Sequence, residues 1–169
     1  INKINNIINE NISEFTCYIA NDNSIGQVVI SGDLKSLDLF SNNLKKQNIK
    51  NVLLPVSAPF HCPLMKDATN EMRNKIQETK FLDPKISIVS NVTANQINGP
   101  EEIKKLLIEQ IEKPVRWRES IQNMINLGTS KFIEIGPGKV LSGLVKRINR
   151  NIKLNQVNKI ADMKDLIND

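Results

Sequence analysis

The stretch "KFIEIGPGKVLSGLVKRI", from Lys131 to Ile148, decides the fold class. Its first five residues, KFIEI, are rich in aromatic and β-branched side chains and end at the turn formers GPG, a pattern typical of a buried strand. The residues that follow predict the helix that leaves this turn. A strand, a glycine-rich turn and a helix form one unit of an alternating α/β fold, whose parallel sheet binds ligands at the carboxyl ends of its strands.

Helices and strands also alternate upstream of this unit, from Pro59 onward. We expect a helix over 61–79, a strand over 85–91, a helix over 99–113 that begins with Pro100, and a helix over 114–128 that ends at Gly128. The apolar face of the first helix comprises Leu64, Met65, Ala68, Met72 and Ile76. A last helix is expected around Asp162 to Ile167. The fold class is therefore α/β.

The first 55 residues have a different order of elements. A helix over 2–12, with Ile4, Ile7, Ile8 and Ile12 on one face, precedes two β-rich runs that the turn formers NDNSIG separate. Asp33 is expected to cap a helix whose buried stripe is Leu34, Leu37 and Leu44, and the segment 49–56 to return as a strand. One more leading strand would complete a β-α-β-β-α-β order. We therefore predict two units, with 1–55 as a ferredoxin-like small subdomain that lacks its first strand and 56–169 as the second unit.

The composition is that of a globular protein, with 40% hydrophobic and 24% charged residues among 169. The net charge of +5 comes from lysines spread over every segment, and the few aromatic residues do not interleave with them. A nucleic-acid interface needs a basic stripe and stacking aromatics, so we expect no nucleic-acid partner. Binding of nucleic acid or phosphate stays a third alternative, supported only by charge and the glycine-rich turn.

The sequence predicts a cytoplasmic protein without a metal or a membrane span. Cys17 and Cys62 are too few and too far apart for a disulfide framework, and the chain has no CxxC pair and no second histidine for zinc. No apolar run reaches the roughly 18 residues that a membrane span requires, and no signal peptide is recognisable. We expect reduced thiols.

The single histidine, His61, lies in the apolar, proline-bracketed stretch "VSAPFHCPLM". It follows an expected strand and begins an expected helix, which is where α/β proteins assemble their sites. Imidazole exchanges protons near neutral pH, so His61 is a candidate general base, although a structural histidine is the alternative. Adjacent helical residues point about 100° apart, so Cys62 does not pair with it and is interpreted as a small buried residue. The chain has no G-x-S-x-G elbow and hence no nucleophile for this base.

The glycine-rich segment "GPGKVLSG" has two interpretations. It is not a phosphate-binding Walker motif, because the glycine required five residues before Gly138 is Ile133. Gly136 and Gly138 either form a plain strand-to-helix turn or present backbone amides to a ligand beside His61.

Four segments, in this order and spacing, resemble the malonyl-CoA:acyl carrier protein transacylase family. They are "NDNSIGQVVISG", "PVSAPFHCPLM", "EQIEKPVRW" and "IEIGPGKVLSGLVKRI". The resemblance spans about Asn5 to Asn149 and corresponds to the C-terminal half of the family's enzyme. It implies that residues 56–169 form the C-terminal part of a large acyltransferase subdomain with an α/β-hydrolase-like parallel-sheet core.

The resemblance also implies roles for individual residues. His61 matches the family's catalytic histidine, which accepts a proton from a serine on a neighbouring loop, and Gln110 matches the position whose backbone carbonyl orients the ring. Asn21 and Asn23 match a segment that reaches the active site from the small lobe, although a structural role in a turn is the alternative. Substrate-binding positions are thus Asn21, Asn23, Gly136 and Gly138.

This sequence also departs from the family pattern. The family's glutamine-rich oxyanion motif, its "GHSLG"-type serine elbow and its malonyl-binding arginine precede the small lobe, and none of them exists in these 169 residues. Arg73 in "EMRNK" lies after His61, on the wrong side of the chain to be that arginine. Ile25 stands where the family often has proline.

The activity that the resemblance implies is malonyl transfer in fatty acid biosynthesis. The substrates are malonyl-CoA and the phosphopantetheine thiol of acyl carrier protein, with no bound cofactor. Without the serine and the arginine, we expect this polypeptide alone to be inactive and marginally stable, and to act only with the missing N-terminal half. The alternative is a non-catalytic remnant that binds acyl carrier protein through Lys104, Lys105, Lys146 and Arg147.

Overall fold

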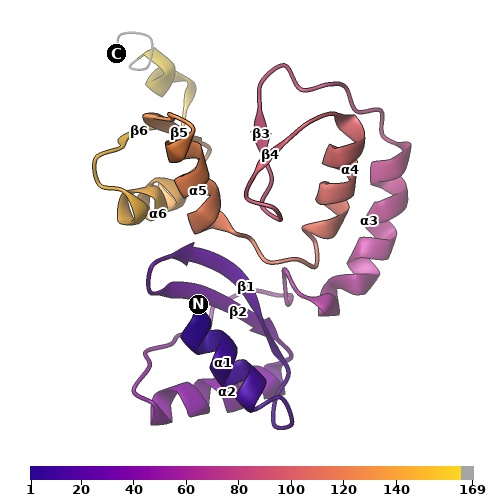
Figure 1. Cartoon of the computed structure of the whole chain (residues 1–169), viewed down its shortest axis with the longest axis vertical. Coiled ribbons are helices and arrows are strands. Elements are labelled where there is room, and N and C mark those ends of the chain that lie inside the picture. The colour runs from indigo at the N-terminus through magenta and orange to yellow at the C-terminus, as the bar shows by residue number, and fades with distance from the viewer. Residues whose placement is uncertain (165–169) are drawn as a thin grey trace.

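The structure is a computed structural model that describes residues 1–164. It is an α/β arrangement in three groups of elements (Figure 1). The N-terminal helices pack against a β-hairpin, a pair of helices stands beside a short second hairpin, and the C-terminal helices accompany a two-stranded parallel sheet. None of the helices over the described residues is both long and apolar enough to cross a membrane.

The N-terminal group forms the expected order of helix, hairpin and helix. It consists of α1 (Asn2–Glu10), β1 (Cys17–Ser24), β2 (Gln27–Gly32) and α2 (Leu34–Lys46). The predicted cap of α2 is confirmed, because the Asp33 carboxylate accepts the Ser36 amide at 2.9 Å. The buried stripe of α2 differs from the prediction: Leu34, in the first turn, is exposed, whereas Phe40 is buried beside Leu44. Similarly, Ile12 is exposed because α1 ends two residues before it.

The hairpin turn is shorter than predicted. Strand β1 continues through Asn21 to Ser24, so only Ile25 and Gly26 form the turn, and Gly26 adopts a φ of 79° that favours glycine. The polar residues remain in the strand because its outer edge has a partner. The Asp22 amide donates to the Val115 carbonyl at 2.9 Å, and the Val115 amide donates to Ala20 at 2.8 Å.

The prediction of a strand over 49–56 is wrong for this structure. Residues 49–56 have no strand pairing, and Val52 is 80% exposed, with Leu53 and Val56 also exposed. A strand forms only when a neighbouring strand takes its backbone groups, and no described segment lies in register with this one. For the same reason the strand predicted over 85–91 shrinks to β3 (Ile88–Val89), paired with β4 (Gln96–Ile97).

The helix predicted over 61–79 begins later than expected. His61 and Cys62 are not helical, and a 3-10 turn, η1 (Pro63–Met65), leads into α3 (Lys66–Glu78). The predicted apolar face of this helix is not buried: Leu64 and Met72 are exposed, and Thr69 is the buried residue of α3. Two of the expected helices are confirmed, as α4 (Pro100–Glu109) and α5 (Trp117–Asn126).

The stretch that decided the fold class forms the predicted strand, turn and helix. Strand β5 (Lys131–Ile135) leads through the glycine turn to α6 (Val140–Ile148), and β6 (Lys153–Val157) then pairs parallel to β5. However, β5 is not buried, since Ile133 and Ile135 are exposed and β6 is its one pairing strand in the described range. The last helix is predicted around Asp162 to Ile167. The 3-10 turn η2 (Ile160–Asp162) ends at its start, Met163 and Lys164 are helical, and residues 165–167 lie outside the described residues.

Candidate active site

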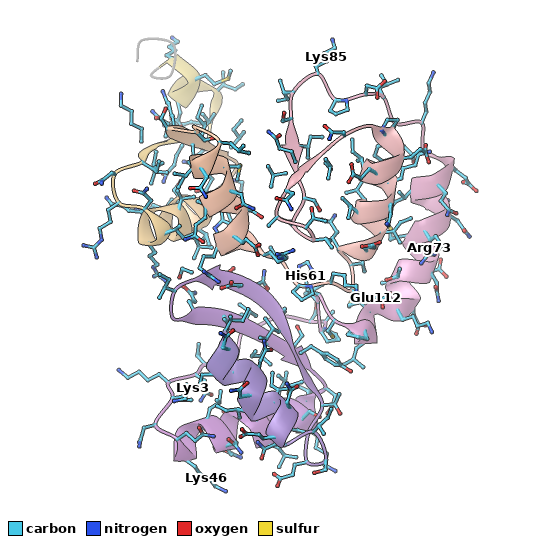
Figure 2. All side chains as sticks on the ribbon, in the orientation of Figure 1. Lys3, Lys46, His61, Arg73, Lys85 and Glu112 are labelled. Carbon is cyan, nitrogen blue, oxygen red and sulfur yellow. The ribbon has the colours of Figure 1, made fainter. Side chains whose placement is uncertain are left out.

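His61 lies where the three groups of elements meet (Figure 2). It belongs to the turn that connects the N-terminal group to η1 and α3, and its ring is partly buried. Its backbone φ is 60°, in the left-handed region that residues other than glycine seldom adopt. Outliers of this kind concentrate at functional sites, where the surrounding structure holds them in place.

The imidazole is oriented by a backbone carbonyl. His61 Nδ1 lies 2.9 Å from the carbonyl oxygen of Gln110, the residue that follows the last turn of α4. Because a carbonyl only accepts, Nδ1 carries the proton in this contact, which leaves the lone pair on Nε2. The carbonyls at a helix C-terminus lack helical partners and carry partial negative charge. The end of α4 is therefore suited to hold an imidazole that gains a positive charge.

Cys62 does not take part in this arrangement. Its side chain is fully buried, and its thiol donates to the Pro59 carbonyl at 3.1 Å. Burial raises the pKa of the Cys62 thiol, which keeps it in the protonated, weakly nucleophilic form. The residue therefore packs and closes the turn around His61.

Asn21 and Asn23 lie on strand β1, so their interpretation as turn residues is wrong. Both are partly buried, and Asn21 stands opposite Val115 in a parallel bridge. Between them, the buried Asp22 carboxylate accepts hydrogen bonds from Arg118 Nε at 3.0 Å and Nη2 at 2.7 Å. The hydrogen bond to Asp22 raises the pKa of the Arg118 guanidinium.

Sequence analysis missed this ion pair between β1 and α5. Two features of the sequence could have predicted it, namely an acidic residue within a β-rich run and the two arginines of "PVRWRE". The other arginine of that motif, Arg116, donates to the carbonyls of Val92 and Thr93 at 3.3 and 3.1 Å. The segment from Val115 to Arg118 thus contacts both the hairpin β1–β2 and the loop after β3, and it leads into helix α5. It lies five residues after Gln110 in the sequence.

Gly136 and Gly138 form the turn after β5, both with positive φ. The Gly136 amide donates to the Val157 carbonyl at 3.0 Å, and the Gly138 amide donates to Asn158 Oδ1 at 2.7 Å. These hydrogen bonds run to the end of β6 rather than to His61. The geometry supports the strand-to-helix turn, and substrate binding by these amides stays a prediction.

The basic residues that sequence analysis grouped as one surface lie on two elements. Lys104 and Lys105 belong to α4 and form ion pairs with Glu101 and Glu109 at 3.3 and 3.9 Å. Lys146 and Arg147 belong to α6, on the other side of the molecule (Figure 1). A single acyl carrier protein surface through all four residues is therefore not formed in this structure.

Arg73 lies on α3, apart from His61 (Figure 2). It lines a groove of about 580 Å³ between α3 and α4, whose other charged residues include Lys104 and Glu112. Within residues 1–164, no three His, Cys, Asp or Glu side chains are grouped so as to hold a metal ion.

His61 thus combines left-handed backbone with a ring nitrogen held on a carbonyl, which makes it the candidate general base of this site. The model of the acyl transferase domain matches residues 7–165. The chain belongs to this family.

The relatives within the family are malonyl transferases. The chain is 45% identical to the malonyl CoA-acyl carrier protein transacylase of Bacillus subtilis over 136 residues. This aligned region is 80% of this chain and 43% of the relative. The acyl-carrier-protein-S-malonyltransferase of Bartonella henselae superposes with a TM-score of 0.93 at 38% identity, over 99% of this chain and 54% of that one. A malonyl-transacylase solved in complex with a type II polyketide acyl-carrier protein superposes with a TM-score of 0.92 at 33% identity. The match covers 100% of this chain and 55% of that one. The chain spans about half the length of these relatives.

Proposed function

We propose that this chain is the C-terminal part of an [acyl-carrier-protein] S-malonyltransferase and supplies its catalytic histidine, His61. The observation that carries the proposal is the 2.9 Å contact between His61 Nδ1 and the Gln110 carbonyl. It fixes the tautomer with a basic Nε2, and no described residue takes that nitrogen as a hydrogen-bond partner. The Gln110 carbonyl orients the histidine as the triad carboxylate does in serine hydrolases.

The reaction proceeds in two acyl transfers. A serine on the complementary half attacks the malonyl-CoA thioester while His61 Nε2 accepts the hydroxyl proton. The bond from oxygen to the acyl carbon forms, the bond from carbon to sulfur breaks, and the imidazolium returns the proton to the departing CoA sulfur. The thiol of acyl carrier protein then gives its proton to Nε2 and attacks the acyl-serine. The bond from sulfur to the acyl carbon forms, the bond from the serine oxygen to that carbon breaks, and the imidazolium returns the proton to the serine oxygen. Throughout, the Nδ1 proton stays on Nδ1 and is donated in a hydrogen bond to the Gln110 carbonyl.

The substrates and the setting follow from the relatives. Their names specify malonyl-CoA and acyl carrier protein, and one relative was solved in complex with an acyl-carrier protein. We place the chain in fatty acid biosynthesis in the cytoplasm, in keeping with its two free cysteines. Residues 1–55 act as a ferredoxin-like small subdomain, supported by the hairpin with α1 and α2, and 56–169 as part of an α/β-hydrolase-like subdomain, supported by the parallel pair β5–β6.

The missing partner is the N-terminal half of the same fold. We assign its footprint to two segments with exposed apolar side chains, which are Val52, Leu53, Leu54 and Val56 in one and Ile133 and Ile135 in the other. These side chains belong to two segments that are extended or edge strands, and strand pairing would cover both. With the half-length match to the relatives, this surface supports the proposal that these 169 residues act together with the half that they do not contain.

The test is co-expression with the N-terminal half of a malonyltransferase that contains the serine elbow and the arginine. The proposal expects a stable complex that acquires a malonyl adduct on the serine by intact mass, whereas this chain alone acquires none. Complex formation without an adduct would identify the chain as a non-catalytic remnant. An adduct on the isolated chain would refute the assignment of the nucleophile to the missing half.

A further inference from the structure

The conformation of His61 needs an explanation beyond its ring contact. Its φ of 60° places a non-glycine residue in the left-handed region, which is unfavourable relative to ordinary backbone. The contact between Nδ1 and the Gln110 carbonyl requires this backbone, because the direction of the side chain from Cα follows from it. Some contact to the backbone must offset the cost.

The structure provides that contact from strand β2. The Ser31 hydroxyl donates to the Phe60 carbonyl oxygen at 2.5 Å. Ser31 is only 8% exposed, and it is held in the hairpin opposite Tyr18. Its hydroxyl therefore reaches the turn from a fixed position in a different element.

The geometry of the peptide bond explains why this acceptor matters. The φ angle of His61 is the rotation about its N–Cα bond, and it sets where the preceding carbonyl, that of Phe60, points relative to the His61 side chain. In ordinary helical or extended backbone this carbonyl would rotate away from its present direction. A hydrogen bond to the Phe60 oxygen therefore selects the left-handed state of His61 directly.

Other contacts of the turn do not have this property. The Cys62 thiol donates to Pro59, and the Met65 amide donates to Cys62, so both close the turn on itself. Within the described residues, Ser31 is the side chain from outside the turn that holds the peptide between Phe60 and His61.

We propose that Ser31 is a positioning residue for His61: its hydroxyl holds the peptide bond before the histidine in the orientation that sets the imidazole on the Gln110 carbonyl. Ser31 touches neither substrate nor the reacting atoms and acts through His61. An effect of Ser31 on catalysis rests on the proposed function. Its effect on the orientation of the His61 ring does not.

The test exploits the fact that the chain has one histidine. Nitrogen NMR of the imidazole reports which ring nitrogen carries the proton, without interference from any other residue. In the unmodified chain the proton is expected on Nδ1. In Ser31→Ala, the ring is expected to shift toward the Nε2-protonated tautomer that free imidazole favours, with exchange of the Nδ1 proton about tenfold faster. Ser31→Thr, which retains the hydroxyl, is expected to restore the original spectrum.

The matched control is Ser120→Ala. Ser120 is also buried and donates to a backbone carbonyl, that of Arg116 at 2.8 Å, but it lies within α5. Its replacement removes the same kind of hydrogen bond and is expected to leave the imidazole spectrum unchanged. An unchanged tautomer and exchange rate in Ser31→Ala, or the same change in Ser120→Ala, would overturn the proposal.

Two further measurements keep the test decisive. If Ser31→Ala does not fold, Ser31→Cys retains most of the volume with a weaker donor, and it should show the same shift to a smaller extent. In the complex with the N-terminal half, Ser31→Ala is expected to lower kcat about tenfold with KM for malonyl-CoA unchanged. A tautomer shift in an inactive complex would uphold the role of Ser31 while contradicting the proposed function.

Discussion

The ion pair between Asp22 and Arg118 offers a sharp energetic prediction, because the same helix carries a second arginine–carboxylate pair in a different environment. The Asp22 and Arg118 side chains are 10% and 29% exposed, and three hydrogen-bond contacts join them. Arg116 and Glu119 also form a two-pronged pair, but both side chains are more than 40% exposed. The two pairs therefore differ mainly in burial.

Replacement of Arg118 by methionine is the more informative perturbation. It leaves the Asp22 carboxylate buried without a cation, and we expect the free energy of unfolding to fall by about 3 kcal/mol. Asp22→Ala should cost less, about 1–2 kcal/mol, because the more exposed guanidinium regains water. The double variant should cost less than the sum of the two. Glu119→Gln, at the exposed pair, should cost under about 1 kcal/mol.

The assay is urea unfolding followed by the fluorescence of Trp117, the single tryptophan and the neighbour of Arg118. Far-ultraviolet circular dichroism provides a second probe of the same transition. A cost for Arg118→Met within about 0.5 kcal/mol of that for Glu119→Gln would refute the reasoning. It would mean that water reaches the Asp22 carboxylate in the folded chain.

Three further predictions concern packing, backbone strain and pH. Ile121→Ala should cost about 3 kcal/mol because this side chain is fully buried, whereas Ile135→Ala, at an 80% exposed site, should cost under about 0.5 kcal/mol in the same urea assay. The unfolding free energy of His61→Gly should exceed that of His61→Ala by about 1 kcal/mol, since glycine adopts a φ of 60° without strain. Equal stabilities of the two variants would contradict backbone strain at this position. The hydrogen bonds from Ser36 lower the pKa of Asp33, so its cap stabilises the fold above about pH 4 and is lost as the pH falls further. Asp33→Asn should flatten this acid dependence in thermal melts between pH 3 and 6, and an unchanged slope would contradict it.

Local signals in the sequence predicted local structure well. The carboxylate at Asp33, the proline at Pro100 and the glycines after β5 specify helix starts and a turn through contacts within a few residues. The pairing of His61 with Gln110 was different in kind, because 49 residues separate them. The family resemblance, and no spacing rule, brought these two residues together.

Two of the wrong predictions have the same physical cause. The strand expected over 49–56 needs a neighbour to take its backbone groups, and no described segment pairs with it. The apolar face of α3 needs a neighbour to cover its apolar area, and Leu64 and Met72 stay exposed. The pair of Asp22 and Arg118 was missed because its partners lie 96 residues apart. Hydrophobic periodicity predicts which side chains a segment can bury. It does not predict whether a second segment is present to cover them.

The most direct test of the account is the rate of acyl-enzyme formation in the complex with the N-terminal half, compared between His61 and His61→Ala. Gln110→Ala serves as the matched control, since it keeps the backbone carbonyl that accepts the hydrogen bond from Nδ1. The account predicts that His61→Ala slows malonylation of the serine by about 10²–10⁴-fold, while Gln110→Ala stays within about threefold. Equal rates for the complex with His61 and the complex with His61→Ala would contradict it.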